Sequence, residues 1–251
     1  MNLFAAELLR ARYRRVTWGV PVGLVAAVIL LVGLAWMTGG EWAAAEMLPL
    51  ALGDTSPYVA WFFAALGASL VGAEHSNGGI TRVLSVEPRR VRVALVKLVV
   101  AAIRGVVGAS FALAFSVAAI AVGMKWGPFT GAPGELWSAE LGAAAVRVCA
   151  GAGVASVLGA VAALLARSTT AALVGLTVMM ALVEPVLANV VPAVGSRGPL
   201  LALLAAMGGP ESAAASLVGG IRDSWTTAVG WSAGLVTLAV VVFSRRDVTE
   251  V

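Results

Sequence analysis

Charged residues are scarce in this sequence, and their scarcity argues against a soluble globular protein. Only 12% of the 251 residues are charged, whereas 60% are hydrophobic and the mean hydropathy is +0.96. An average soluble chain carries roughly a quarter charged residues. A domain of this length must show water a mostly polar surface, so its core cannot absorb the surplus of apolar residues. The composition therefore predicts an integral membrane protein.

The side chains that most often carry chemistry are also few. The single cysteine, Cys149, permits no intrachain disulfide and no cysteine-based metal cluster. The single histidine, His75, cannot build a two-histidine metal site, and we interpret it as an ordinary interfacial residue. Phosphate-binding loops place serine or threonine after their lysine, but leucine and tryptophan follow the only lysines here, Lys97 and Lys125. We therefore expect no catalysis, metal or cofactor in this chain.

Six apolar runs are long enough to cross a bilayer, which needs about 17 to 25 helical residues. They predict an all-α fold with one transmembrane domain over residues 1–251, and they cover residues 16–37, 57–73, 93–123, 141–166, 169–191 and 225–243. Two shorter apolar stretches precede the last run, at 200–207 and 212–217. Because neither can span, we expect two short helices that rest at the outer surface or dip into it.

Small residues recur at four-residue spacing in several of these runs. Such ladders let helix backbones approach closely, which is how helices associate in lipid without a hydrophobic driving force. We expect packing faces at three of them: Gly19 with Gly23, Ala101 with Gly105 and Ala109, and Gly151 with Ala155 and Gly159.

Basic residues gather at the ends of the runs, which indicates topology rather than nucleic-acid binding. Twelve fall on one side: Arg10, Arg12, Arg14, Arg15, Arg82, Arg89, Arg90, Arg92, Lys97, Arg167, Arg245 and Arg246. Only three fall on the other: Lys125, Arg197 and Arg222. The positive-inside rule places the larger set and both termini in the cytoplasm. We expect the arginines at 10, 12, 14, 15, 89, 90 and 92 to lie at the inner membrane surface.

The segment from Asn2 to Arg15 mixes apolar residues with a basic group. This pattern favours a short helix along the inner membrane surface, with a frayed positive tail as the alternative.

Apart from Lys97 near the start of the third run, three charges lie within the apolar runs and are therefore candidates for functional sites. Arg104 is close enough to the cytoplasmic side to snorkel towards it or to reach Glu74. Arg147 and Glu184 each lie seven residues from the outer end of their run, about 10 Å deep. Equal depth predicts that these two residues form an ion pair.

The loop after the second run carries the most specific pattern in the chain. Its residues resemble the corresponding loop in permeases of type-2 ABC exporters, with matching positions at Glu74, Gly78, Ile80, Pro88, Arg89, Arg90 and Lys97. The sequence departs from that pattern at Gly79, where the family usually has threonine, and Thr81 is displaced by two positions. Two further segments look like those of actinobacterial members of the family. They are the basic N-terminal segment that leads into Thr17 and Trp18, and the C-terminal residues 245–248.

The resemblance implies a non-catalytic permease subunit in a bacterial cell membrane that moves an amphipathic or hydrophobic cargo outward: a drug, antibiotic, peptide or lipid. It implies two copies of a separate ATPase subunit, which would bind ATP and magnesium, and a second permease chain, identical or related. It also implies that the loop is a coupling helix docked on the ATPase through Gly78, Gly79, Ile80, Thr81, Val83, Leu84 and Pro88.

The residues of the loop allow two arrangements. Ile80, Val83 and Leu84 follow helical spacing, so a short helix would show an apolar face to a partner. The alternative is a loop that packs only on its own span ends.

Two other functions stay open at this point. One is a membrane assembly or immunity protein that transports nothing. The other is an ion-driven carrier, although Glu184 is the only acidic residue inside a run and carriers usually use several carboxylates or broken helices. Pro185 would provide such a break in the fifth run.

Overall fold

The computed structural model describes residues 3–13, 19, 22–23, 26, 37, 42–43, 56–126, 129–130, 138–209, 213–218 and 221–245. Nearly all of these residues are helical, so the predicted all-α membrane fold is confirmed. Among them, five helical stretches are long and apolar enough to cross a membrane: α4 (Ser56–Ser76), α6 (Arg90–Trp126), α7 (Ala139–Ala166), the stretch Thr169–Val190, and Asp223–Arg245 within α13 (Ile221–Arg245). The predicted first span, 16–37, lies outside the described residues except for isolated positions.

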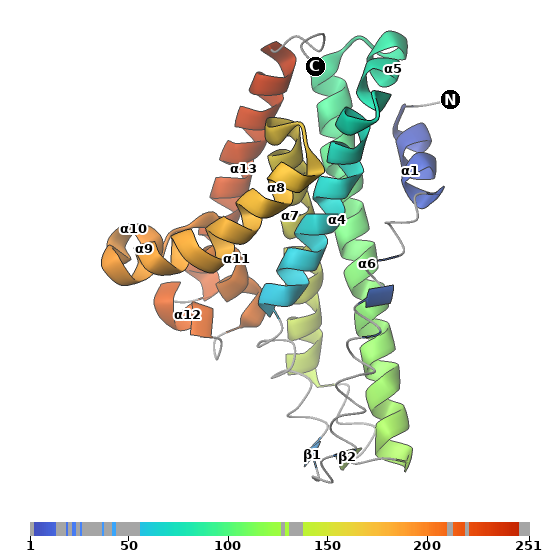
Figure 1. Ribbon diagram of the computed structural model, residues 1–251. Helices are drawn as coiled ribbons and strands as arrows, with labels where there is room; N and C mark the ends of the chain where they lie inside the picture. Colours follow the sequence, from blue (N-terminus) through green and yellow to red (C-terminus); the bar gives the residue numbers. More distant parts are fainter. Residues whose placement is uncertain are drawn as a thin grey trace.

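Helices α4, α6, α7 and α13 run roughly side by side, whereas the stretch Thr169–Val190 runs obliquely away from them towards α10 (Figure 1). One end of the bundle, named here the α5 end, carries α1 (Leu3–Tyr13), α5 (Gly79–Val86) and the last turn of α13. The opposite end carries two-residue strands, β1 (Trp42–Ala43) and β2 (Phe129–Thr130), which pair in parallel. Helix α1 and strand β1 thus lie at opposite ends (Figure 1).

Helix α7 is the centre of the bundle, and glycines bring its backbone against both neighbours. A Cβ atom on Gly159 would overlap the carbonyl of Ala64 in α4, and one on Gly105 of α6 would overlap the carbonyl of Ala152. The ladders predicted in these two helices are therefore confirmed as packing faces. The spacing did not single out Gly67 of α4, which meets the backbone of Ser156 in the same way.

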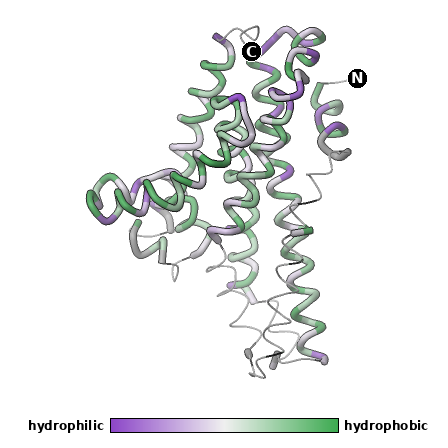
Figure 2. The backbone as a smooth tube through the Cα atoms, viewed as in Figure 1, coloured by the Kyte–Doolittle hydropathy of each residue, from purple (hydrophilic) through white to green (hydrophobic). Residues whose placement is uncertain are grey.

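The outer faces of α6 and α13 are apolar and exposed, as expected for surfaces that meet lipid. Many of the hydrophilic positions gather at the α5 end, whereas hydrophobic positions follow the length of the helices (Figure 2). Helix α6 has 37 residues, so it is about 55 Å long and exceeds the roughly 30 Å hydrocarbon core. Its ends therefore reach beyond the lipid tails on at least one side.

The fifth run continues through its proline. It consists of α8 (Thr169–Val178), a π-helical turn η2 (Met179–Val183) and α9 (Glu184–Val190). The backbone N–H of Glu184 donates to the carbonyl of Met179, five residues back, which widens the helix just before Pro185. Proline cannot donate an N–H, and a wider turn re-routes the hydrogen bonds around it. Pro185 thus alters the helix without ending it.

The segment before the last span enters the bundle rather than resting on its surface. After α10 (Pro192–Gly195), helix α11 (Pro199–Gly208) turns inward, and every residue from Leu200 to Met207 is buried. It packs against α4, α7 and α13, and is followed by the short helix α12 (Ala213–Val218). Of the two predicted arrangements, the surface-resting one is wrong for α11, because an all-apolar helix gains most by burial on every side.

Close packing of α7 on α4 predicts a steric effect confined to one face of α7. Gly159→Ala should lower the free energy of unfolding by about 1 to 3 kcal/mol, the usual cost of overpacking. The measurement is thermal unfolding of the detergent-purified protein.

Gly142→Ala is the matched control for this substitution. Gly142 belongs to the same helix, but its added Cβ would meet nothing within 4 Å. The control should be neutral or slightly stabilising, since alanine favours helix over glycine. Equal destabilisation by both substitutions would contradict the close approach of α7 to α4.

Candidate functional site

Helix α5 forms a compact corner between two spanning helices. Gly78 adopts the left-handed conformation (φ 63°) that separates α4 from α5, and its carbonyl accepts a 2.6 Å hydrogen bond from the Thr81 hydroxyl. At the other end, the N–H of Glu87 donates to the carbonyl of Val83, and Pro88 follows before α6 begins. The predicted short helix is therefore present, with a defined start and stop.

The apolar face of α5 is turned into its own chain. Ile80 and Val83 are 4% and 6% exposed, and Ile80 joins a buried cluster that includes Leu98 and Phe243, with Leu84 packed at its edge. The expectation that these residues face a partner is wrong for the chain as folded. The span ends offer apolar surface at once, so the shortest route to burial is within the same chain.

The face of α5 that remains available to a partner is mostly polar. Thr81, Arg82 and Ser85 are exposed, and Val86 is the most exposed large hydrophobic residue described, at 86%. Of the predicted coupling residues, Gly78, Thr81 and Pro88 lie on the accessible side, and Gly79 is half-buried against Glu74.

Beneath α5 lies a cluster of four charged side chains from three helices, of which Glu7, Glu74 and Lys97 are buried and Arg10 is exposed at the rim. The Lys97 ammonium on α6 pairs with the Glu74 carboxylate on α4 and lies 3.3 Å from the Glu7 carboxylate on α1. Arg10 of α1 lies 3.2 Å from the Glu7 carboxylate and 4.0 Å from that of Glu74. We name Glu7, Arg10, Glu74 and Lys97 the charge cluster.

The charge cluster is electrically balanced, which explains how it tolerates burial. Its two acids and two bases carry opposite formal charges, and the Lys97 side chain is only 3% exposed. Buried charges are tolerated when paired, because their mutual attraction offsets the loss of water. The cluster therefore joins α1, α4 and α6 just below α5. The basic pattern of the N-terminal segment predicted α1, but not that Glu7 would be its buried residue.

His75 and Phe243 show how the end of α4 meets α13. The His75 ring packs edge-on against Phe243, with ring centroids 6.3 Å apart, and its Nδ1 lies 3.2 Å from the carbonyl of Val71. Within the described residues, no group of three or more potential ligands surrounds His75.

The remaining predicted surface arginines divide into two groups. Arg89 and Arg92 are exposed and Arg90 is half-buried at the start of α6, and Arg92 pairs with Glu87 at 3.0 Å. Arg12 is in α1, but its side chain lies outside the description, as do the whole residues Arg14 and Arg15.

The predicted ion pair between Arg147 and Glu184 is wrong, because each residue serves a different end of α11. Glu184 is 3% exposed, and its carboxylate accepts hydrogen bonds from the backbone N–H groups of Leu200 and Leu201. These are two of the orphan donors that begin every helix. The residue before the helix is Gly198, which has no side chain to cap them, and any Cβ there would collide with the Glu184 carboxylate.

Arg147 of α7 lies at the C-terminal end of α11. A Cβ on Gly209, the residue after the helix, would lie 3.1 Å from the guanidinium of Arg147. An acid at the start and a base at the end both complement the helix dipole. The two intramembrane charges are thus matched to the same short helix, and equal depth does not make them a pair.

Arg104, the third intramembrane charge, is half-buried on α6. Glu74 is paired with Lys97 in the charge cluster. The two alternatives for Arg104, snorkelling to the cytoplasmic side or reaching Glu74, stay predictions.

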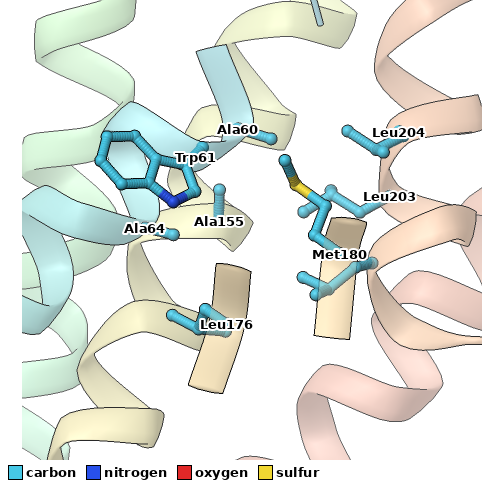
Figure 3. Close-up of a pocket in the computed structure, with 9 residues that line it drawn as sticks. Ala60, Trp61, Ala64, Ala155, Leu176, Met180, Leu203 and Leu204 are labelled. Atoms are coloured by element: carbon cyan, nitrogen blue, oxygen red, sulfur yellow. The ribbon is translucent and has the colours of Figure 1, made fainter. Parts of the chain in front are cut away.

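A small apolar pocket lies between α4, α7, the fifth run and α11 (Figure 3). Trp61, Ala155, Met180 and Leu203 are among its lining residues, and its volume is about 10 Å³. That space is close to the volume of one water-sized probe, so this pocket does not hold a cargo molecule.

The role of Glu184 predicts a specific mutational pattern. Glu184→Ala should lower the free energy of unfolding by about 1 to 3 kcal/mol, because two buried N–H groups lose their acceptor. Glu184→Gln keeps one carbonyl oxygen and should recover part of this loss. Adding Arg147→Ala to Glu184→Ala should restore nothing in a thermal unfolding assay. If the double variant were more stable than Glu184→Ala alone, the two residues would form a direct ion pair after all.

The charge cluster predicts a strong dependence on Lys97. Lys97→Met should destabilise the protein by about 3 to 5 kcal/mol, because two buried carboxylates lose their central cation. Hydrogen exchange should speed up in α1, whose docking depends on that cation. Adding Glu74→Gln should restore part of the stability. Unchanged exchange in α1 would show that the cluster does not hold this helix.

Comparison with protein-family models and with curated proteins finds no match to this chain. What the sequence and structure show directly is an all-α protein with several candidate membrane spans, a corner helix and a charge cluster beneath it.

Proposed function

We propose that this chain is the membrane-spanning permease subunit of an ATP-driven exporter of the type-2 ABC class. The observation that carries the proposal is α5, a helix of eight residues placed between two spanning helices at one end of the bundle. Its loop is also the part of the sequence that resembles these permeases. The cargo class is amphipathic or hydrophobic, as the resemblance implies.

The packing of α5 suits a part that transmits movement. Ile80 and Val83 are buried against the chain itself, so a push on the exposed face would be carried into α4 and α6. The Glu74–Lys97 pair connects the same two helices one turn further in. Close-packed contacts transmit displacement rather than absorb it. In this proposal Thr81, Arg82, Ser85 and Val86 form the docking face, and Ile80 and Val83 anchor it.

ATP hydrolysis belongs to a partner in this proposal. The two lysines of the chain lie outside any phosphate-binding loop. Two copies of a separate ATPase subunit would supply the nucleotide and magnesium sites, and a second permease chain, identical or related, would complete the membrane part.

The same proposal places the α5 end in the cytoplasm of a bacterial cell. The excess of basic residues supports this orientation, since the described basic segments before α6, after α7 and at the end of α13 belong to the favoured side. Both termini would then be cytoplasmic, which supports an even number of spans.

Coexpression with an ATPase subunit encoded beside this chain tests the function. The variant Arg82→Glu/Val86→Asp should fold normally, because both side chains are exposed, but should lose most ATPase copurification and cargo-stimulated hydrolysis. Burial of one or two partner-facing side chains gives about 1.5 to 3 kcal/mol each, enough for a tenfold or larger change in affinity.

The matched control makes the same charge change at the opposite end. Lys125 and Thr130 are exposed there, so Lys125→Glu/Thr130→Asp should leave association intact. Full ATPase association by the α5 variant would refute the docking face. Failure of any ATPase subunit to copurify with the unaltered chain would refute the exporter assignment and favour a membrane assembly or immunity protein.

A further inference from the structure

An open groove of about 770 Å³ lies at the α5 end, between the start of α6 and the end of α13. Its upper wall is basic and its lower wall is aliphatic. The lining residues are Pro88, Arg89, Arg90, Val91, Arg92, Leu95, Val96 and Ser244. The groove is thus polar at one end and apolar at the other, which is the profile of an amphipathic ligand.

The aliphatic wall continues as a stripe along α6. Val91, Leu95, Val99 and Ile103 follow one another at four-residue spacing, and all are between 37% and 48% exposed. Residues at this spacing line one side of a helix. The stripe is about 18 Å long at 1.5 Å per residue, close to half of the roughly 30 Å hydrocarbon core. It is therefore as long as one leaflet is deep.

The basic wall lies beside the first turn of this stripe, at the α5 end. Arg92 follows Val91 and precedes Leu95 by three positions, so helical periodicity places it on the same side as the stripe. Arg89 is exposed beside it, and the Arg92 guanidinium shares one 3.0 Å contact with Glu87 while its side chain stays 51% exposed. Helix α6 also begins here, at Arg90, and the start of a long helix favours an anion.

We propose that this groove binds an anionic phospholipid, with the phosphate at Arg89 and Arg92 and one acyl chain along the Val91–Ile103 stripe. Basic grooves between helices at the membrane surface suit acidic lipid head groups. The inference goes beyond the proposed transport function and does not depend on it, because it needs only that α6 spans the bilayer.

Two other occupants fit the same observations less well. A water-soluble protein would cover the arginines but would not reach a stripe that continues for about one leaflet's depth into hydrocarbon. A second copy of the chain would bring a second set of arginines against the first, and like charges repel. A lipid accounts for both walls with one molecule.

Native mass spectrometry of the full chain in neutral detergent tests the proposal. The probes are phosphatidylglycerol and phosphatidylcholine with identical acyl chains. We expect phosphatidylglycerol to bind at least tenfold more tightly. Arg89→Gln and Arg92→Gln should each weaken it about fivefold, the effect of one arginine near an anionic head group. Leu95→Glu should weaken it further by placing a negative charge on the acyl-chain wall.

Arg82→Gln is the matched control, because Arg82 is exposed at the same end but does not line the groove. It should change phosphatidylglycerol affinity less than twofold. Glycerol 3-phosphate, which has the head group but no acyl chain, should fail to displace the lipid at millimolar concentration. Equal binding of both lipids, an equal loss with Arg82→Gln, or displacement by glycerol 3-phosphate would each overturn the proposal. All variants should first elute as the unaltered protein does in size-exclusion chromatography.

Discussion

A helix that begins and ends inside a membrane bundle leaves backbone N–H and C=O groups where no water can satisfy them, and this constraint organises the lower half of the molecule. Helix α11 is such a helix, with its residues buried from Leu200 to Met207. Glu184 reaches its first N–H groups and Arg147 lies at its last turn. With its first N–H groups satisfied and a cation beside its last turn, α11 can fill the space between α4, α7 and α13 as core.

The π turn before Glu184 also helps to place the carboxylate at the start of α11. It lies immediately before Glu184 and Pro185, and the wider turn changes the rotation of everything that follows it in the fifth run. Gly198 contributes by leaving room for that carboxylate. A proline, a glycine and two charges thus act together around one short helix.

The α5 end is organised by a different balance, between charge and burial. Lys97 is shielded from water yet lies among two carboxylates, so its ammonium is held by α1 and α4 at once. Helix α5 rests on apolar residues just beside this point, with Ile80 in the same buried cluster as Leu98. The corner is therefore tied to the spans both by charge and by packing, while its outer face stays polar.

Periodicity and length were enough to predict the five spans among the described residues, the helix at Gly79–Val86 and the ladder packing of α7, because each depends on local spacing. The partners of individual charges depend on how helices rotate against one another, which spacing does not encode. Arg147 and Glu184 have equal depth in the sequence, but α11 lies at both of them and changes their partners. Likewise, the spacing of the apolar residues of α5 correctly predicted a buried face, but it did not indicate whether this chain or a partner would bury it. The burial of Glu7 could not be predicted, since a single acidic residue in a basic segment is normally expected to face solvent.

The charge cluster also orders events during synthesis. Glu7 and Lys97 are 90 residues apart, so at roughly 5 to 20 residues per second the cation follows the acid by about 5 to 20 seconds. During that interval Glu7 and Glu74 have only Arg10 of the cluster's two cations, and burying them together would leave an excess of negative charge. Docking of α1 must therefore wait until α6 has begun to enter the membrane, so this helix is placed long after its own synthesis.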